Sequence, residues 1–510
     1  MKYFCVSARA LAVAVPVLLW GTTAWAQGNI EHCDEHLGSF EDAFECGDEL
    51  FGTSFNADDG VGAKVGDGGR FTRVPRADRV GAGEWANHAP QRATGPNASA
   101  CEVCHSDPVE DGAGEAGFNV IRDPEHSALP SRFIQRNTPH VFAIGAMQRL
   151  AEEMTEELQA IVDGTKSSTC NNRRTTTRSL TTKGVNFGSV TARFSSSGQC
   201  PQSVTVNAVG IDSDLIVKPL QWKGVIKSVR EFNRDASHNE LGMQAVELTG
   251  NDVDGDGDGV TNEMTIADQT ALSIYLSAQP RPVTLIELDK LRAKLEGMGR
   301  SGREEADELG LPDLSSAEIS AINSGEQTFN QIGCNGCHRP FLTLDNPRFR
   351  EPSRNVNYRD SPRFPAGQPG LDPARAITFD LTADQPDNVI EVDGNVVARL
   401  GSIQKDFFGN GIVRLFGDLK RHDMGPELAE NIDEKGTGAS VWLTENLWGA
   451  GSTAQYLHDG RATTLPEAIA FHGGEGAASR SAFNGLSSNS KANLLAFVNN
   501  LVLFKVEEEE

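Results

Sequence analysis

The sequence predicts a mainly α-helical fold with a small β-rich insertion and long ordered loops. Apolar residues recur at helical spacing in several segments, for example at Ile144, Met147 and Leu150. Between residues 165 and 217 the composition shifts to Thr, Ser and alternating Val, which is typical of short strands. Residues 345–390 are rich in Pro, Asp and Arg and poor in apolar side chains, which indicates a long loop. The 510 residues are enough for two or three domains with sizeable cores.

The start of the chain, residues 1–26, is typical of a secretory signal peptide. Lys2 and Arg9 supply its positive region, and Ala24-Trp25-Ala26 is a small-x-small cleavage site. The apolar run Leu11–Trp20 is too short to cross a bilayer, and no later segment is long enough. We therefore expect an exported, periplasmic protein without a membrane span.

Two Cys-x-x-Cys-His motifs stand far apart in the chain. In this pattern the two thiols can add to the vinyl groups of one haem, and the histidine becomes the proximal ligand of its iron. A zinc site would need a further pair of ligands, and the chain has no other Cys-x-x-Cys. We therefore predict two covalently bound haem c groups. The residues are Cys101, Cys104 and His105 for haem 1 and Cys334, Cys337 and His338 for haem 2.

The predicted order of domains follows from these motifs. Helical periodicity surrounds both of them, as two cytochrome c-type haem domains require, and the β-rich segment interrupts the first domain. The expected limits are 27–164 for the N-terminal part of the first haem domain, 165–217 for the insertion, 218–310 for the completion of the first haem domain and 311–510 for the second haem domain.

The other cysteines and the net charge indicate the cellular compartment and exclude some classes of partner. Outside the signal peptide and the haem motifs four cysteines remain, and they form two sequence-close pairs, Cys33 with Cys46 and Cys170 with Cys200. In an oxidising compartment these pairs predict two disulfides, each stabilising the fold by about 3 kcal/mol. The formal charge of −25 argues against nucleic acid and anionic lipid as partners.

An acidic segment at residues 252–263 matches the calcium-loop pattern D-x-D-x-D-G-x5-E. Carboxylates packed this densely repel one another unless a cation binds between them, so we predict a structural calcium; a solvated acidic turn is the alternative. Two registers fit the spacing. The ligands are Asp252, Asp254, Asp256 and Glu263 in the first register, and Asp254, Asp256, Asp258 and Asn262 in the second.

Six short motifs beyond the haem signatures point to one superfamily. They are Arg136-Asn137-Thr138-Pro139, Trp222-Lys223-Gly224, Glu240-Leu241-Gly242-Met243, Arg421-His422-Asp423-Met424-Gly425-Pro426, Tyr456-Leu457-His458-Asp459-Gly460 and Phe471-His472-Gly473-Gly474-Glu475. With these motifs the chain resembles the bacterial di-haem cytochrome c peroxidases from about residue 95 to 502. Within that superfamily it most resembles the branch of the di-haem oxidoreductases.

The resemblance implies which residues carry electrons and protons to haem 1. In the superfamily a Trp lies between the haems and a distal carboxylate follows it; Trp222, with Glu240 eighteen residues later, matches these positions. An indole between two haems offers a π bridge for electrons, and a carboxylate can move a proton between the oxygens of peroxide. A core aromatic and a helix-end surface acid are the alternatives. The chain departs from the family by about 80 residues inserted before the Trp, and the distal Gln region reads Arg230-Glu231-Phe232, so Arg230 is the substitute.

The resemblance also implies the ligands of haem 2. The family's second axial residue stands fourteen positions after the His of its Tyr-x-His-Asp-Gly motif, which here is His472 after His458. A capping-box start and a glycine stop enclose the short helix that leads to His472. We therefore predict that His338 and His472 both bind the haem 2 iron, with Met424 as the rival ligand.

Haem 1 is expected to keep an open or weakly held distal side. His126 lies where some peroxidases keep a removable sixth ligand; an exposed loop histidine is the alternative. Enzymes of this class also hold a calcium between their domains, and the positions that match are Asn137, Thr453 and Gln455.

Together these residues predict an exported di-haem oxidoreductase of peroxidase type. Haem 2 would collect electrons from a cytochrome or a cupredoxin, and haem 1 would react with hydrogen peroxide. Relatives include enzymes that oxidise a partner protein, so a protein substrate is a further possibility. The alternatives are a non-catalytic di-haem electron-transfer cytochrome and a dioxygen-dependent oxygenase.

Overall fold

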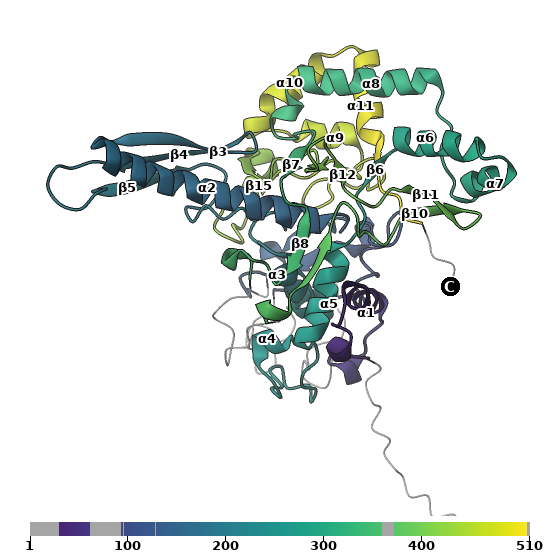
Figure 1. The fold of residues 1–510 in the computed structure, drawn as a ribbon, viewed down its shortest axis with the longest axis horizontal. Coiled ribbons are helices and arrows are strands. Elements are labelled where there is room, and N and C mark those ends of the chain that lie inside the picture. The colour runs from purple at the N-terminus through teal and green to yellow at the C-terminus, as the bar shows by residue number, and fades with distance from the viewer. Residues whose placement is uncertain (1–29, 62–92, 95, 128, 360–371, 507–510) are drawn as a thin grey trace, which may run out of the picture.

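The computed structural model describes residues 30–61, 93–94, 96–127, 129–359 and 372–506 (Figure 1). The predicted signal peptide at 1–26 lies outside the described residues. Of the described residues 37% are helical and 16% are in strands, with 11 helices and several small sheets. The prediction of a mainly α fold was therefore wrong, because helices and small sheets are mixed. Among the described helices, none combines the length and the apolar character that a membrane span requires.

Before residue 280 the fold consists of helices, one three-stranded sheet and one strand pair. The elements are α1 (Phe40–Gly52), β1 (Val120–Arg122), β2 (Ile134–Arg136), α2 (Ile144–Asn172), β3 (Thr176–Thr182), β4 (Val185–Arg193), β5 (Ser203–Ala208), α3 (Val229–Ala236), α4 (Val246–Thr249) and α5 (Ile266–Ser277). The sheet order is β3-β4-β5, and β1 pairs with β2. All of these pairings are antiparallel, so hairpins rather than crossovers connect the strands.

After residue 280 helices alternate with many short strands. The elements are β6 (Val283–Thr284), α6 (Leu285–Glu296), α7 (Arg300–Glu308), α8 (Ser316–Gln331), β7 (Leu342–Leu344), β8 (Arg348–Glu351), β9 (Ile377–Asp380), β10 (Val389–Val392), β11 (Asn395–Arg399), β12 (Gln404–Lys405), β13 (Gly411–Val413), β14 (Arg421–Asp423), β15 (Val441–Leu443), α9 (Leu465–Ala470), α10 (Ala477–Gly485), α11 (Ser488–Asn499) and β16 (Leu501–Val502). The sheets are β6-β16, β12-β13-β7, β8-β9, β10-β11 and β14-β15, and all are antiparallel.

The short strands after residue 340 explain why the fold class was mispredicted. None of them is longer than five residues, so each face carries at most two or three side chains and no alternation can be detected. Their partners can also be distant in the chain, as where Leu342 of β7 pairs with Val413 of β13. Strands β8 and β9 lie within the segment 345–390 that was expected to be a loop. Tertiary pairing, and not local pattern, formed them.

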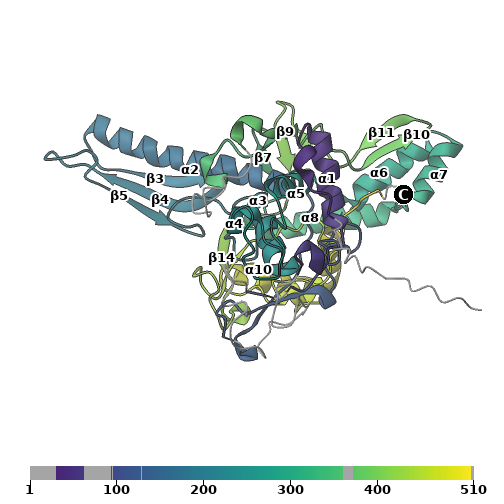
Figure 2. The same cartoon turned by 90° about the horizontal axis from the view of Figure 1, so that it is seen from below.

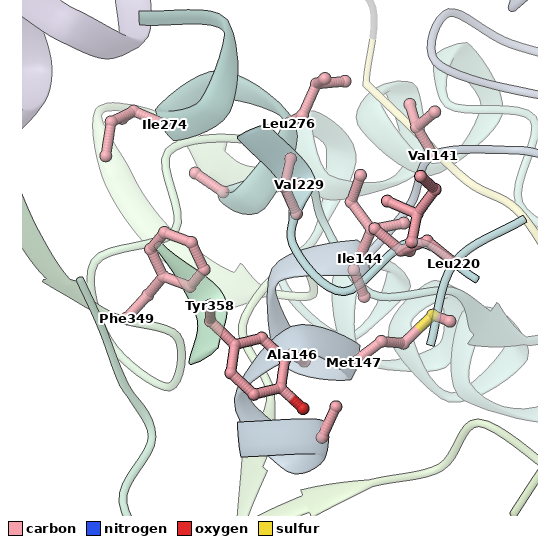
Figure 3. Packing of buried hydrophobic residues seen from close by; sticks show 14 of the residues in the cluster. Val141, Ile144, Ala146, Met147, Leu220, Val229, Ile274, Leu276, Phe349 and Tyr358 are labelled. Carbon is pink, nitrogen blue, oxygen red and sulfur yellow. The ribbon is translucent and has the colours of Figure 1, made fainter. Parts of the chain in front are cut away.

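The helix expected around Ile144 is α2, which is 29 residues long. Ile144, Met147 and Leu150 are all buried, as the periodicity predicted. Figure 3 shows Ile144 and Met147 with Val141 and Leu220 in one cluster of buried hydrophobic side chains. The N-terminal half of α2 is therefore part of the main core.

The N-terminal segment is held against α5 by a close helix contact and a disulfide. A Cβ at Gly47 of α1 would lie 2.4 Å from the carbonyl oxygen of Ala271 in α5, so only glycine allows the helices to approach this closely. Cys33 is disulfide-bonded to Cys46. The backbone N–H of Cys33 also donates to the Asp268 carboxylate at 2.8 Å.

The last turns of α2 and the sheet β3-β4-β5 project from the body as an arm, residues 165–211 (Figures 1 and 2). It occupies the place of the predicted β-rich insertion. Leu180 and Val190 of the sheet are fully buried in the arm. A disulfide between Cys170 and Cys200 joins the end of α2 to the loop between β4 and β5. The arm is therefore a stiff extension of the core helix.

The C-terminal part of the chain is built around α8 and α11. Phe329 of α8 and Phe497 of α11 lie in one core cluster, with ring centroids 5.3 Å apart. A second cluster joins Leu291 of α6 to Ile390 of β10 and Val502 of β16. These packings bring the end of the chain back to residue 283, where β16 pairs with β6.

Gly325 should be a critical residue for the α8 and α11 contact. A Cβ at Gly325 would lie 1.9 Å from the carbonyl oxygen of Asn493 in α11. We expect Gly325→Ala to lower the free energy of unfolding by about 1–3 kcal/mol, because the helices must move apart. Denaturant unfolding measures the change.

Gly164→Ala in α2 is the matched control. There the added Cβ meets only the guanidinium end of Arg178, so the higher helix propensity of Ala should leave the free energy of unfolding unchanged or raise it by up to about 1 kcal/mol. Equal effects of the two substitutions would contradict the tight contact at Gly325.

Candidate functional site

Two largely apolar cavities lie side by side in the body, and each is lined by one Cys-x-x-Cys-His motif. Cavity 1 has a volume of about 210 Å³ and is lined by residues 101, 104 and 105. Cavity 2 has a volume of about 640 Å³ and is lined by the motif at 334–338. The four motif cysteines form no disulfide, which fits thioether bonds to haem. Residues 137–140, 222 and 443–446 line both cavities and form a shared wall.

Three predicted iron ligands share one hydrogen-bonding pattern. Nδ1 of His105, His338 and His472 lies 3.2, 3.2 and 2.9 Å, respectively, from a main-chain carbonyl oxygen. The acceptors are the carbonyl oxygens of Gly112, Phe416 and Ala468. Because a carbonyl oxygen can only accept, Nδ1 carries the proton and Nε2 keeps a lone pair for a metal. Such second contacts orient metal-binding histidines.

Burial keeps these three imidazoles neutral. It lowers the pKa of His105 and the pKa of His338 to about 4, and it also lowers the pKa of His472. A histidine must lose its proton before it binds a metal, so neutral rings near pH 7 fit an iron-binding role.

In cavity 2 the structure brings His338 and His472 together from segments more than 130 residues apart. Their ring centroids are 6.2 Å apart. Metal–nitrogen bonds of about 2 Å on both sides of one iron would separate two imidazole centroids by about 6 Å. His472 follows α9, which begins at the predicted capping box of Thr464 with Glu467. The two histidines therefore fit one haem iron between them.

Met424, the rival ligand, also lines cavity 2. Its loop packs main chain to main chain on the loop that follows His472. A Cβ at Gly473 would lie 2.6 Å from the carbonyl oxygen of Met424, and one at Gly474 would lie 2.1 Å from that of Asp423. This close approach is the reason for two glycines after His472. Both candidates thus lie at the cavity, and the distance of 6.2 Å between the imidazole centroids of His338 and His472 favours His472.

Trp222 lies in the wall that the two cavities share. Its indole N–H donates to the carbonyl oxygen of Asn137 at 2.9 Å. Its own carbonyl oxygen accepts from the backbone N–H of Leu443 at 3.0 Å. Both partners also line both cavities. The indole is therefore held between the two haem motifs, where a bridging residue would have to be.

Glu240 lines cavity 1 from a short π-helical turn, Ser237–Leu241. Burial raises the pKa of Glu240 to about 7 against the opposing charge of Arg122. Nη1 of Arg122 lies 3.7 Å from Oε1 of Glu240, and Nε of Arg122 lies 3.2 Å from Glu434. The carboxyl can therefore gain or lose a proton near neutral pH.

Arg230, predicted as the distal substitute, is not among the residues that line cavity 1. Its buried guanidinium forms ion pairs with Glu247 and, at 3.2 Å, with Glu351. Removing a buried arginine from two carboxylates would be costly, so it holds α3 in the core. Cavity 1 is lined instead by Arg136 of the Arg136-Asn137-Thr138-Pro139 motif and by Arg122, which no sequence signal marked because it ends the three-residue strand β1.

His126, predicted as a removable ligand, is likewise not among the residues that line cavity 1. It lies in a turn where its backbone N–H donates to the carbonyl oxygen of Asp123 at 3.1 Å. His140 does line both cavities, but its Nε2 lies 3.0 Å from the carbonyl oxygen of Trp448. Neither histidine is therefore placed as a distal ligand of haem 1.

Glu445 is a carboxyl that was not singled out from the sequence. It lies in the shared wall and lines both cavities. Burial raises the pKa of Glu445 to about 7. Its only sequence signal is the polar triplet Thr444–Asn446 after the strand β15, which is too common a pattern to indicate a site.

The acidic loop brings three predicted calcium ligands together. The carboxylate oxygens of Asp254, Asp256 and Asp258 lie within 4.8 Å of one another. Asp252 is turned away, because its Oδ1 accepts from the side-chain amide of Asn262 at 2.9 Å. The first three ligands of the register that begins at Asp254 are therefore adjacent, whereas the register that begins at Asp252 is dispersed. Glu263, the last ligand of that first register, accepts from the backbone N–H of Gln244 at 2.7 Å.

The positions predicted for an interdomain calcium form a hydrogen-bonded cluster. The side-chain amide of Asn137 donates to the carbonyl oxygen of Gln455 at 3.0 Å. Nε2 of Gln455 donates to the side-chain oxygens of Asn119 and Asn137, at 3.0 and 3.3 Å. The Thr453 hydroxyl donates to the carbonyl oxygen of Gly449. Asn137 and Gln455 are thus neighbours, and the side-chain oxygen of Asn137 already accepts a hydrogen bond from the amide of Gln455.

The family comparison covers the C-terminal part of the chain. The family model described as "Di-haem oxidoreductase, putative peroxidase" matches residues 381–501. This segment contains Met424, His458 and His472, and so three of the motifs on which the resemblance was based. Over these residues the match agrees with the resemblance to the di-haem oxidoreductase branch, and the family's description implies haem cofactors. A search of curated proteins finds no match.

Substitution of the two candidate ligands should decide which one binds haem 2. We expect His472→Ala to convert haem 2 from low spin to high spin, because one of two imidazoles is lost. Optical and electron paramagnetic resonance spectra of the haem-loaded protein measure the spin state. Met424→Ala is the control and should leave haem 2 low-spin. A high-spin signal in Met424→Ala alone would identify the thioether as the ligand.

Proposed function

We propose that this protein is an exported di-haem c-type oxidoreductase of peroxidase type, which reduces hydrogen peroxide at haem 1 with electrons that enter through haem 2. One observation carries the proposal. A carboxyl with a pKa of about 7, Glu240, lines one haem-motif cavity, and Trp222 lies in the wall toward the other. The family match over residues 381–501 supports redox chemistry of this kind.

The residues at the two cavities suit covalent haem. When bound, haem would supply the electron storage and the oxidising chemistry. The thiols in each cavity would form thioether bonds, and neutral imidazoles with free Nε2 atoms would bind iron. The residues are Cys101, Cys104 and His105 for haem 1 and Cys334, Cys337, His338 and His472 for haem 2.

Glu240 would move protons on peroxide. As the carboxylate it accepts a proton from one oxygen of hydrogen peroxide, and as the acid it returns the proton to the other oxygen, which leaves as water when the O–O bond breaks. Two electrons, which bound haem would supply, and two further protons would convert the remaining oxygen to a second water. A pKa of about 7 populates both forms at neutral pH. Arg122, 3.7 Å away, would stabilise the negative charge that develops on oxygen.

Trp222 would relay electrons between the haems. Its N–H is satisfied by Asn137 and its backbone is bound to β15, so the ring is kept in the wall. A rigid indole at this position shortens the path through non-aromatic atoms between the two haem sites.

The setting and partners are part of the same proposal. The predicted signal peptide at 1–26 would direct the chain to the periplasm, where the disulfides Cys33–Cys46 and Cys170–Cys200 persist. The electron donor would be a cytochrome or a cupredoxin that reaches haem 2, or an oxidisable protein substrate. The haem domains would span 27–310, interrupted by the arm, and 311–510.

Replacement of Glu240 tests the proton role. Glu240→Gln should lower peroxide turnover by about 100-fold or more and leave the haem spectra unchanged. In the wild-type protein turnover should rise with pH through about 7, because Glu240 then loses its proton and can act as the base. The variant should lack this pH dependence, which a steady-state peroxidase assay from acid to alkaline pH measures.

Glu445→Gln is the matched control, since it removes the other cavity carboxyl whose pKa is about 7. It should retain turnover, and loss in this variant alone would assign the proton role to Glu445. Low-spin spectra for both haems without turnover would select an electron-transfer cytochrome. Turnover that requires dioxygen in the presence of catalase would select an oxygenase.

We also propose that the acidic loop binds a structural calcium through Asp254, Asp256 and Asp258. Chelation should lower the Tm, because the clustered carboxylates then repel one another. Asp256→Asn should remove most of the calcium-dependent change in Tm, and Asp252→Asn should not. Thermal unfolding with and without chelator measures both. An equal loss in Asp252→Asn would favour the first register, and a wild-type Tm unaffected by chelation would indicate a solvated acidic turn.

A further inference from the structure

The arm differs in charge from the rest of the protein. Its 47 residues, 165–211, include six Lys or Arg and no Asp or Glu. The whole chain carries a formal charge of −25, so the remaining residues carry −31. The packing of the arm does not require it to be positively charged, because most of its charged groups are on the surface.

Three exposed arginines gather at the tip of the arm. Arg173 is the C-cap of α2, Arg174 follows it, and Arg193 is the last residue of β4. Thr176 at the start of β3 pairs with Ala192, so Arg193 lies beside the residues that leave α2. Like charges are therefore concentrated at one end of a narrow structure, an arrangement that repulsion disfavours.

No acid in the described part of the chain forms an ion pair with Arg173, Arg174 or Arg193. The cations nearer the body are different, since Lys166 pairs with Asp163 and Lys183 pairs with acids of α2. The helix dipole favours cations at the C-terminus of α2, which accounts for Arg173 and Arg174. It does not account for Arg193 on the neighbouring strand, so the tip is available to an anionic partner.

The outer face of α1 carries the complementary charge. The helix contains no Lys or Arg. Its exposed acids lie at helical spacing on the surface away from α5, and in the described residues none of them forms an ion pair. These acids are Glu41, Asp42, Glu45 and Glu49. The arm tip and the outer face of α1 therefore carry charges of opposite sign.

The two surfaces cannot meet within one molecule. Figures 1 and 2 show the arm tip and α1 far apart on the molecule. The arm cannot fold back, because α2 is one continuous helix of 29 residues, or about 43 Å, and its N-terminal half is buried in the core. Helix α1 is in turn fixed on α5 through Gly47. Any pairing of tip and α1 must join two molecules.

We propose that the arm tip docks on the outer face of α1 of a second copy of this chain, so that the protein self-associates in solution. A second copy presents a surface whose opposite charge is known from the sequence. An anionic lipid surface fits less well, because it would repel the body with its charge of −31. The contact uses the outer face of α1, whereas Phe51 of the same helix is buried and lines cavity 1, and the proposal does not depend on the proposed peroxidase activity.

Sedimentation velocity of the haem-loaded full chain tests the proposal. Pairing of exposed charges weakens with salt, since the Debye length falls from about 30 Å at about 0.01 M to about 3 Å at about 1 M. We expect a dimer or larger assembly at low salt and a monomer at high salt. Reversing the tip charges should give a monomer at both salt concentrations. The substitutions are Arg173→Glu, Arg174→Glu and Arg193→Glu in one chain.

A matched control has the same change in net charge at another place. It reverses three exposed cations of α6 and α7, which lie at the opposite side of the molecule from the arm in Figure 1, and it should associate like the wild type. The substitutions are Lys290→Glu, Arg300→Glu and Arg303→Glu. Unchanged haem spectra and Tm establish that each variant is folded.

A reciprocal variant makes the test specific to α1. Glu41→Lys, Glu45→Lys and Glu49→Lys should also give a monomer alone. A mixture with the tip variant should associate again, because each variant then meets a surface of opposite sign. A monomeric wild type at low salt, equal dissociation of the control, or a mixture that stays monomeric would overturn the proposal. Arg-dependent binding of a monomeric wild type to phosphatidylglycerol vesicles would assign the tip to lipid instead.

Discussion

The wall between the two cavities depends on one hydrogen bond, from the indole N–H of Trp222 to the carbonyl oxygen of Asn137. It ties the segment at 137–140 to the segment around 222, and the backbone bond from Leu443 adds the third part of the wall. The indole is partly buried, and a fully buried N–H without an acceptor would cost about 1–3 kcal/mol. The same bond therefore keeps the ring in place and separates the two sites.

The motif histidines of the two cavities have similar surroundings. The other lining residues of the two cavities differ. In both, Nδ1 of the motif histidine lies 3.2 Å from a main-chain carbonyl oxygen, which leaves Nε2 for a metal. In cavity 2 a second imidazole, that of His472, has its ring centroid 6.2 Å from that of His338. In cavity 1 the lining includes a carboxyl of raised pKa and an arginine, Glu240 and Arg122. This asymmetry fits one site for electron entry and one site for chemistry on a small oxidant.

Features that depend on residues close together in the chain could be predicted from the sequence. Features that depend on contacts between distant segments could not. Helix α2 could be predicted because its buried residues recur within each turn, and α9 because its cap involves residues three apart. The strands β8 and β9 could not be predicted, since each is short and pairs with a segment brought to it by the fold. Arg230 was assigned by its place in the chain, yet Glu247 and Glu351 hold it in the core.

The sequence by itself determined which residues are predicted to hold haem. Thiols and histidine in a five-residue motif are neighbours in any fold, so the two motifs and the family resemblance could be read from residue types alone. Only the tertiary structure decided what surrounds them. It placed Arg122 and Glu445 at cavity 1 and kept Arg230 in the core, away from that cavity. It also bonded Asp252 to Asn262 and not to the other acids of the loop. Such neighbours depend on how distant segments pack, and packing has no local signature in the chain.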